Sequence, residues 1–177
     1  MPIYSARYLE IQNSISEFLE NNFGSDKYQK ILIGVSGGAD SLALAQTVIN
    51  ANDKHTLIPI IVDHGLQEIS KEVTQNTKTI LLKMGYEQVE IFKVNVELED
   101  GVEASARRAR YRAFYTCLEN FNSNVMLLAH TQDDQAETVL MGLARGSGTR
   151  SLSGMAKLNP PFFRPLLDFT RKDTELI

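Results

Sequence analysis

The residues with the clearest chemical potential form a short loop, called here the glycine loop. It follows an apolar run directly and reads Ser36-Gly37-Gly38-Ala39-Asp40-Ser41. Glycines carry no Cβ, so the backbone can approach a ligand closely. A helix starting at this point would offer unpaired N–H groups and a partial positive charge. The loop therefore predicts a phosphate site, to which Ser36 and Ser41 add hydroxyl groups; the alternative is a simple turn with a serine or Asp40 as helix cap.

Asp40 is the unexpected member of the glycine loop. A carboxylate beside a phosphate is unfavourable unless it also binds a metal ion or an ammonium group. We therefore predict that Asp40 is a Mg²⁺ ligand or a contact for an amine. The loop lacks the lysine of a Walker loop and the G-x-G-x-x-G pattern of a dinucleotide site, so neither of these classes is indicated.

A second group of reactive side chains consists of three carboxylates within about one helical turn, just after a histidine. These residues are His130, Asp133, Asp134 and Glu137. Carboxylates so close together repel one another, which indicates a site facing Mg²⁺ or a substrate amine. The alternative is that Asp133 caps the helix and the other two carboxylates favour its positive end. Because His130 ends an apolar run ahead of this cluster, we predict that it belongs to the site.

A third group is an arginine cluster on a predicted helix. Arg107 and Arg110 are three residues apart and share a helix face, with Arg108 and Arg112 between and beyond them. Guanidinium groups bind phosphates or carboxylates, often through two hydrogen bonds. The same residues would also make an ordinary solvated helix face, and their types and spacing leave both interpretations open.

Alternating helices and strands are needed to position these groups. The hydrophobic pattern predicts helices at 7–22, 42–50, 68–84, 103–118 and 133–144, and strands at 30–35, 57–62, 89–96 and 125–129. Such alternation predicts an α/β fold with a doubly wound, mainly parallel sheet and helices on both faces. Ligands in such folds bind at the carboxyl ends of the strands. The glycine loop, Asp63-His64 and residues 130–134 all follow strands, so we expect them to meet.

The C-terminal part of the chain is less regular. The proline-containing run 160–165 predicts a stiff, extended segment. Thr170 is predicted to cap a helix that begins near the end of the chain. We interpret residues 1–177 as a single domain that has been truncated.

Composition narrows the class of protein. The net charge is −4, which argues against non-specific electrostatic binding of nucleic acid. Cys117 is the single cysteine, so no disulfide within the chain and no multi-cysteine metal site can form. We expect Cys117 to pack in the core. No secretion signal or membrane-spanning apolar run is visible, so we expect no membrane association and a cytoplasmic location.

The motifs resemble those of a known superfamily and of one family within it. The glycine loop looks like the SGGxDS loop of the N-type ATP pyrophosphatases, which cleave ATP to AMP and pyrophosphate. From about Lys30 to Leu167 the chain resembles the tRNA(Ile)-lysidine synthetases. The matching segments are the glycine loop, Val62-Asp63-His64-Gly65-Leu66, residues 103–111, residues 130–138, Arg145-Gly146-Ser147-Gly148 and Arg164-Pro165-Leu166-Leu167. Many members have His and Arg where Thr131 and Ser105 stand here, so these two positions carry no inferred role.

The resemblance implies a PP-loop catalytic domain with the Rossmann-like fold of the adenine nucleotide α-hydrolases. It implies an enzyme that uses ATP and Mg²⁺ to activate the C2 carbonyl of the wobble cytidine in an isoleucine tRNA with a CAU anticodon by adenylylation. Free L-lysine then displaces AMP. It implies that the glycine loop and Asp63 bind the nucleotide, that Asp134 and Glu137 bind lysine, and that Arg110 contacts substrate with His130 nearby. The family's C-terminal tRNA-binding domains would be absent from this chain. Whether the chain forms a homodimer stays open, as does whether a carboxylate or His130 takes the lysine proton.

Three other functions are compatible with the glycine loop. A tRNA-modifying enzyme of the 2-thiocytidine type would need cysteines for sulfur handling, and Cys117 alone supports this poorly. An amidating synthetase is less consistent with the segments around His130 and Arg145. A nucleotide-binding domain that is inactive without the missing part is the third interpretation.

Overall fold

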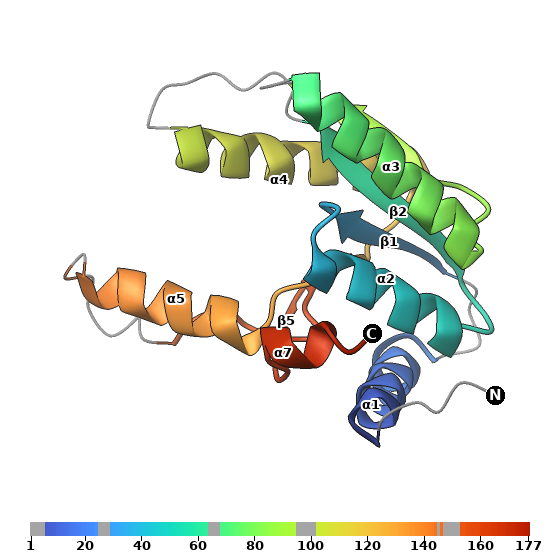
Figure 1. The fold of residues 1–177 in the computed structure, drawn as a ribbon, viewed down its shortest axis with the longest axis horizontal. Coiled ribbons are helices and arrows are strands. Elements are labelled where there is room, and N and C mark those ends of the chain that lie inside the picture. Colours follow the sequence, from blue (N-terminus) through green and yellow to red (C-terminus); the bar gives the residue numbers. More distant parts are fainter. Residues whose placement is uncertain (1–5, 25–28, 64–67, 95–101, 145, 147–152) are drawn as a thin grey trace.

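A six-stranded sheet forms the centre of the chain (Figure 1). The computed structural model describes residues 6–24, 29–63, 68–94, 102–144, 146 and 153–177. The strands are β1 (Lys30–Val35), β2 (Thr56–Asp63), β3 (Glu90–Lys93), β4 (Met126–Leu128), β5 (Leu158–Asn159) and β6 (Phe162–Phe163). All pairings between neighbouring strands are parallel except that of β5 with β6.

The order of the strands creates a switch point beside β1. The sheet runs β3-β2-β1-β4-β6-β5, so the chain moves outward from β1 to β3 and then returns to the other side of β1. Connections that leave two neighbouring strands in opposite directions open a crevice between their carboxyl ends. That crevice lies between β1 and β4, which are the strands that precede the glycine loop and His130. The predicted fold class is confirmed.

The continuous apolar sequence of β1 is explained by helices on both faces of the sheet. Ile31 and Ile33 are fully buried in one core cluster and Leu32 is fully buried in the other, as expected when alternate side chains point to opposite faces. Gly34 lies next to Phe114 and Leu128, where an added Cβ would approach both side chains to about 3 Å. The close packing of the helix of Phe114 on the sheet therefore depends on a glycine at this position.

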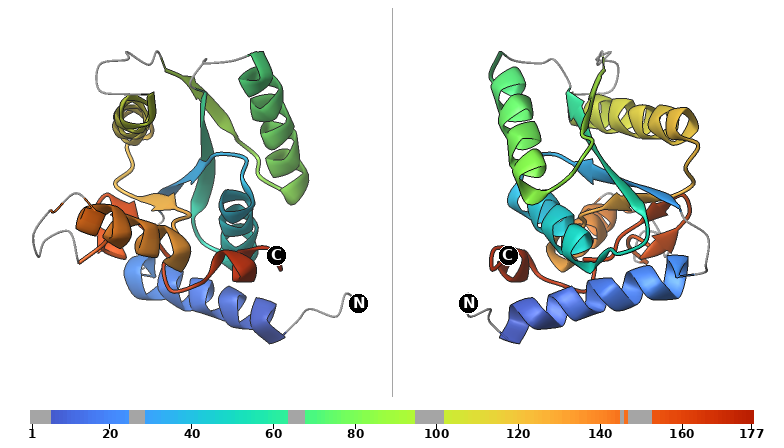
Figure 2. Two further views of the ribbon diagram at one scale, coloured as in Figure 1. Left: turned by 60° about the vertical axis from the view of Figure 1, so that its left-hand side comes forward. Right: turned by 90° about the vertical axis from the view of Figure 1, so that its right-hand side faces the viewer.

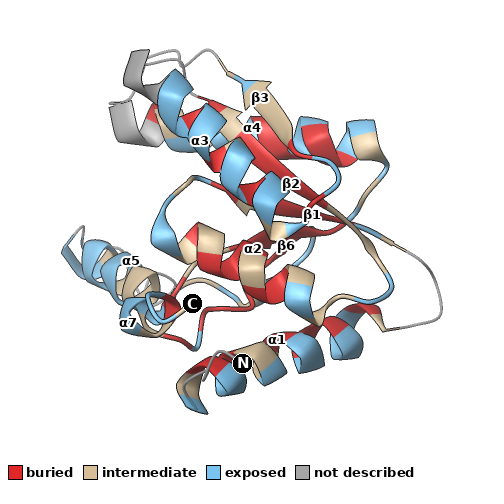
Figure 3. Cartoon of the chain, turned by 45° about the vertical axis from the view of Figure 1, so that its right-hand side comes forward, coloured by how far each residue is buried: buried red, intermediate tan, exposed pale blue. Residues whose placement is uncertain are grey.

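Helices cover the two faces unequally (Figure 2). The helices are α1 (Ala6–Phe23), α2 (Ala39–Ala51), α3 (Glu68–Met84), α4 (Val102–Phe121), α5 (Gln132–Ala144) and α7 (Arg171–Thr174). Side chains of α1, α2 and α3 pack into one core cluster, and those of α4 pack into the other. Buried residues accordingly gather on the sheet and on the inner sides of these helices (Figure 3). Helix α5 has no buried residue and extends away from the sheet (Figure 1).

Cys117 lies in the core, as predicted. Its side chain is fully buried in the cluster between α4 and the sheet, and burial raises the pKa of the thiol to about 12. A buried, protonated thiol packs as a small apolar group. Among the residues described, no helix combines the length and hydrophobicity that a membrane span requires.

The prediction for residues 160–165 is wrong. Instead of one extended run, the chain reverses at a cis peptide bond between Pro160 and Pro161, and β5 and β6 pair as a short antiparallel hairpin. Phe162 and Phe163 are buried, and β6 adds to the sheet beside β4. The prediction that Thr170 caps the last helix is confirmed, since its hydroxyl accepts from the backbone N–H of Asp173 in a capping box.

Candidate active site

A cleft of about 480 Å³ opens at the switch point. It lies where β1 and β4 end, between residues of the glycine loop, α4 and α5. The polar residues that line it are Ser36, Asp40, Ser41, Arg107, Arg110, Tyr111, His130, Asp134, Glu137 and Thr138. The structure thus brings together the three groups of residues that the sequence singles out for chemistry, although they come from distant parts of the chain.

The glycine loop makes a sharp turn between β1 and α2. Gly37 has a φ of +86°, in the left-handed region where a side chain is strained. Gly38 is the N-cap of α2 and makes no side-chain capping hydrogen bond. The first N–H groups of a helix have no partner within the helix, so the start of α2 has donors and positive potential for an anion.

Ser41 stabilises this turn from within. Its hydroxyl donates to the Gly38 carbonyl at 2.8 Å and accepts from the backbone N–H and the hydroxyl of Ser36, each at 3.2 Å. Ser41 is buried, whereas Ser36 is exposed. In the free chain both hydroxyl protons are therefore used inside the loop, and Ser36 is the more exposed of the two serines that line the cleft.

Asp40 is held by the C-terminal helix α7. One of its carboxylate oxygens accepts a hydrogen bond from the Thr174 hydroxyl, and the other lies 3.5 Å from Nε of Arg171. The Arg171 guanidinium also lies 3.4 Å from the Asp134 carboxylate. A single cation thus bridges carboxylates from two different strand ends. This contact offsets the repulsion between the two acidic groups.

The carboxylates at the start of α5 have different partners. Oδ2 of Asp134 accepts from the backbone N–H of Thr131 at 2.7 Å and from its hydroxyl at 3.0 Å. Asp133 accepts instead from the backbone N–H of Arg171 at 2.7 Å. Asp133 is therefore a contact to α7 and not the helix cap that the alternative interpretation assumed. Glu137 is exposed and lines the cleft.

His130 is half-buried at the end of the segment that follows β4, and it contacts a buried arginine. Nε of Arg164 donates to Nδ1 of His130 at 3.2 Å, and Arg164 itself is only 5% exposed. Burial, and then the positive charge of Arg164, lower the pKa of His130 to about 4. His130 is therefore neutral at physiological pH.

Two arginines of α4 border the cleft opposite α5. Arg107 and Arg110 both line it, and both are exposed. The guanidinium of Arg107 lies over the ring of Tyr111, 5.5 Å from its centroid. Stacking of this kind holds a guanidinium in place without neutralising its charge. Of the two interpretations left open by the sequence, the position of these residues favours an anion-binding role.

Some predicted residues do not border the cleft. Asp63 ends β2 and is buried, and its neighbour Val62 lines the cleft in its place. Gly37 and Ala39 shape the glycine loop without lining the cleft. His64 and most of the segment 145–148 lie outside the described residues. A nucleotide-binding role for Asp63 stays a prediction.

The sequence did not predict the residues that hold the side chains of the site in place. Arg164, Arg171 and Thr174 contact His130, Asp40 and Asp134, but each belongs to the C-terminal segment in which the hydrophobic pattern is weak. For Arg164 a signal existed, because it begins the Arg-Pro-Leu-Leu run that matches the resembling family. For Arg171 and Thr174 only the capping signal of Thr170 placed the helix that carries them.

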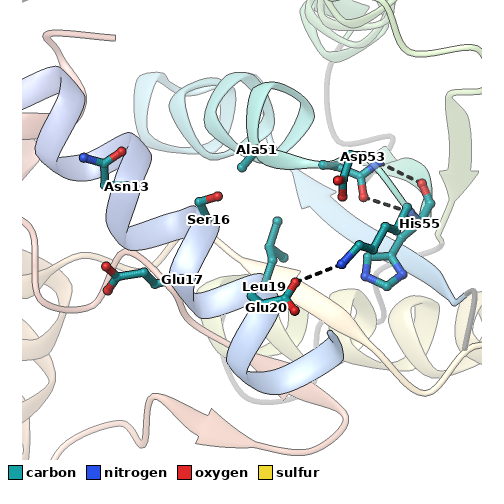
Figure 4. A pocket seen from close by; sticks show the side chains of 10 residues that line it. Asn13, Ser16, Glu17, Leu19, Glu20, Ala51, Asp53 and His55 are labelled. Carbon is teal, nitrogen blue, oxygen red and sulfur yellow. Dashed lines mark hydrogen bonds and ion pairs between the residues drawn. The ribbon is translucent and has the colours of Figure 1, made fainter. Parts of the chain in front are cut away.

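A second pocket of about 420 Å³ lies at the opposite edge of the sheet, between α1 and the turn from α2 to β2 (Figure 4). Lys54 and Glu20 form an ion pair there at 3.2 Å, and the backbone of His55 is held by Asn52. None of the residues that were predicted for catalysis lines this pocket. The cleft at the switch point is therefore the candidate active site.

The fold and the cleft define a nucleotide-binding α/β domain with its phosphate loop after the first strand. The PP-loop domain family matches residues 7–177, so the chain belongs to that family. Membership implies ATP binding. Among curated proteins, the chain is similar to the tRNA(Ile)-lysidine synthase of Mycolicibacterium paratuberculosis, with 42% identity over 93% of this chain and 48% of that protein. It is similar to the tRNA(Ile)-lysidine synthase of Nocardia farcinica, with 46% identity over 81% of this chain and 44% of that protein.

These similarities confirm the resemblance stated from the motifs. The chain spans about half the length of the curated relatives it matches. Among solved structures it is similar to the U34-tRNA thiolase NcsA from Methanococcus maripaludis, with a TM-score of 0.77, 18% identity, and coverage of 96% of this chain and 62% of that one. It is also similar to the NH3-dependent NAD synthetase of Campylobacter jejuni, with a TM-score of 0.62, 15% identity, and coverage of 94% and 70%. At these identities the likeness concerns the fold alone.

Proposed function

We propose that this chain is the catalytic domain of a tRNA(Ile)-lysidine synthase. The enzyme would use ATP to adenylylate the C2 carbonyl oxygen of the wobble cytidine in isoleucine tRNA with a CAU anticodon, releasing pyrophosphate. Free L-lysine would then attack C2 and displace AMP. The observation that carries the proposal is the single cleft in which the glycine loop, the arginines of α4 and the acidic start of α5 meet. The identity of 42–46% to proteins named for this activity supports it.

The first step, adenylylation, needs a site for the triphosphate. The N–H groups at the start of α2 and the hydroxyl of Ser36 would bind the phosphates that leave as pyrophosphate. Donors fixed before the reaction stabilise developing negative charge without having to reorganise. Arg107 and Arg110 line the same cleft as this loop and would hold the tRNA phosphate or the α-phosphate.

Mg²⁺ fits the residues that are present if it binds together with the ATP phosphates. Among the described residues no group of three or more acidic, histidine or cysteine side chains could hold a metal ion alone. Mg²⁺ usually needs only one or two protein carboxylates, because phosphates and water supply the other ligands. Asp40 is at the glycine loop and lines the cleft, so it would be that carboxylate. When bound, the ion would neutralise phosphate charge.

The second step needs a site for a cationic amino acid. Asp134 and Glu137 lie one helical turn apart on α5 and both line the cleft. Their carboxylates would bind the ammonium groups of lysine beside the adenylylated cytidine. Thr131 fixes one oxygen of Asp134, and the other lies 3.4 Å from Arg171, where an ammonium group would compete for it. Glu137 is the more exposed of the two carboxylates and would contact the bound lysine directly.

The chemistry of the cysteine disfavours sulfur transfer. The thiolase similar in fold is described with a [4Fe–4S] cluster. The present chain has one cysteine, and Cys117 is fully buried on the α4 face of the sheet. A single buried thiol can neither ligate such a cluster nor form a persulfide at the cleft.

The test is ATP–pyrophosphate exchange by this chain in the presence of unmodified isoleucine tRNA, followed by incorporation of labelled lysine. Exchange and lysine transfer are expected in the parent. Asp40→Ala is expected to abolish exchange, because it removes the carboxylate that would hold Mg²⁺ at the phosphates. Asp53→Ala is the matched control, since Asp53 is an exposed carboxylate at the opposite edge of the sheet.

The outcomes separate the proposal from its alternatives. Near-normal exchange by Asp40→Ala would remove Asp40 from the mechanism. ATP binding without exchange would identify the chain as a nucleotide-binding domain that is inactive alone. Transfer of sulfur in place of lysine would refute the proposal.

A further inference from the structure

The pair formed by Arg164 and His130 fixes the position of a proton in the cleft. Arg164 follows β6, and its side chain is held on both sides. Nε donates to Nδ1 of His130 at 3.2 Å, and a terminal nitrogen donates to the carbonyl of Ala156 at 2.9 Å. Its backbone N–H donates to the carbonyl of Lys157 at 2.9 Å. With 5% of its surface exposed, Arg164 has little freedom to turn away from His130.

The chemistry of these two side chains allows one arrangement of hydrogens. An arginine stays protonated in proteins and has no acceptor, so its Nε can only donate. The ring nitrogen of His130 that faces Arg164 must therefore carry a lone pair. A neutral imidazole has one N–H group, which places the hydrogen on Nε2. A ring turned by 180° would put a carbon against the guanidinium and lose the bond, so this orientation is the favourable one.

The charges around His130 keep it neutral. Arg164 acts on it from the segment after β6, and Arg107 and Arg110 act on it from α4. Asp134 of α5 is the acidic group that favours protonation, but burial and the three arginines outweigh it and lower the pKa to about 4. Protonation of Nδ1 would also place an imidazolium directly against the guanidinium. Neither nitrogen of His130 is therefore ready to accept a proton at neutral pH.

We propose that Arg164 is a positioning residue that holds His130 as a hydrogen-bond donor through Nε2, so that His130 binds a substrate oxygen and does not act as the base. The inference rests on the proposed function. His130 lines the cleft, so its Nε2–H would donate to a phosphate oxygen or to the O2 of the cytidine. The proton lost by the lysine amine would then pass to a carboxylate of the cleft.

The arrangement of hydrogens can be measured directly on this chain. It contains three histidines, and the variants His55→Gln and His64→Gln would assign the signals of the other two. Two-bond nitrogen–proton NMR spectra distinguish the two neutral tautomers from the charged form. His130 is expected to have its hydrogen on Nε2 and to remain neutral from pH 8 to about pH 5. A hydrogen on Nδ1, or titration near the ordinary value of about 6.5, would overturn the proposal.

A substitution of Arg164 tests what holds the tautomer. Arg164→Met keeps a long apolar stem and removes the donor and the charge. We expect the two tautomers to mix and the pKa of His130 to rise toward its ordinary value. Arg112→Met is the matched control, because Arg112 is an exposed arginine of α4 that is not among the charges acting on His130. An unchanged His130 signal in Arg164→Met would refute the role of Arg164.

Substitution of His130 distinguishes a donor from a base. Glutamine has an amide N–H near the position of Nε2 but takes up no proton at neutral pH. The rate of ATP–pyrophosphate exchange in His130→Gln is therefore expected to stay within about tenfold of the parent. In His130→Ala the same rate should fall about 100-fold or more, as when one fixed donor to a developing oxyanion is removed. Equal losses in both variants would contradict the donor role. If the parent itself shows no exchange, the proposed function fails, and the NMR spectrum still decides the tautomer.

Discussion

The geometry of the glycine loop makes the effect of Gly37→Ala calculable. Gly37 has a φ of +86°, and a Cβ built there would lie 2.5 Å from Oγ1 of Thr77 on α3. Thr77 is buried, and its hydroxyl donates to the carbonyl of Val73 at 2.8 Å. The methyl group therefore meets two penalties, one from its own backbone conformation and one from a neighbour that cannot move without breaking a hydrogen bond.

Both penalties have known sizes. The left-handed conformation costs a non-glycine residue about 1–2 kcal/mol. Forcing an extra methyl group into a packed site typically costs about 1–3 kcal/mol. Gly37→Ala is therefore expected to lower the free energy of unfolding by roughly 2–5 kcal/mol in total. The loop should also move away from α3, and a displacement of this kind at the phosphate site should weaken ATP binding.

A second substitution separates the two penalties. With Thr77→Ala the nearest remaining atoms to the new Cβ lie 3.5 and 3.7 Å away, which is ordinary contact. Only the conformational cost should remain in the double variant, so the two substitutions should be coupled by about 1 kcal/mol or more. Gly85→Ala is the control for that cost, because Gly85 has a φ of +106° and its Cβ would lie 3.6 Å from the nearest atom.

Urea denaturation of the parent and these variants gives the free energies, and calorimetry with ATP gives the affinities. If the losses from Gly37→Ala are equal with and without Thr77, the close contact to Oγ1 does not limit this position. If Gly37→Ala costs no more than Gly85→Ala, the clash is absent. Either result would refute the reasoning.

Two further predictions concern carboxylates. Glu137→Gln is expected to raise the lysine concentration needed for half-maximal AMP release by about tenfold, because a charge-assisted hydrogen bond is lost. The affinity for ATP, measured by calorimetry, should stay unchanged. An equal loss of ATP affinity would contradict a lysine-binding role. The hydrogen bonds from Arg7, at 2.8 and 2.9 Å, hold the pKa of Asp173 well below its usual range. Asp173→Asn should therefore have a lower free energy of unfolding than the parent at pH 7 in urea denaturation. This difference should narrow below about pH 4, as protonation of Asp173 removes the stabilisation from the parent. A difference in free energy that does not depend on pH would contradict this prediction.

The central part of the fold could be predicted because its signals are local. Each parallel strand is a short apolar run between helices, and the helices have clear stops such as Gly85. The hairpin of β5 and β6 could not be predicted in this way. Its strands have two residues each, too few to show a period, and the prolines between them argued for an extended run. The pairing of Phe162 beside β4 depends on a contact that no local pattern encodes.

The cleft could be predicted in outline for a related reason. Residues that follow parallel strands lie at the same end of the sheet, so the alternation of strands and helices in the sequence predicts that the glycine loop and His130 share that end. That β1 and β4 are neighbours, which brings the two together, is seen only in the structure. Their protonation and hydrogen-bond partners could not be predicted, because these depend on Arg164, which is 34 residues from His130 in sequence. The role of His130 as acceptor toward an arginine follows only from the tertiary contact.

Helix α7 connects these observations, because it contacts the carboxylates in the first turns of α2 and α5. Arg171 lies 3.5 Å from Asp40 and 3.4 Å from Asp134, distances longer than those of strong charge-assisted hydrogen bonds. The guanidinium therefore balances the two negative charges in the free chain without holding either of them tightly. Under the proposed function, an incoming Mg²⁺ or ammonium group would compete for the same oxygens, while Thr174 keeps Asp40 in position. Because Arg7 of α1 anchors this helix through Asp173, the orientation of the acidic residues depends on a contact between the two ends of the described chain.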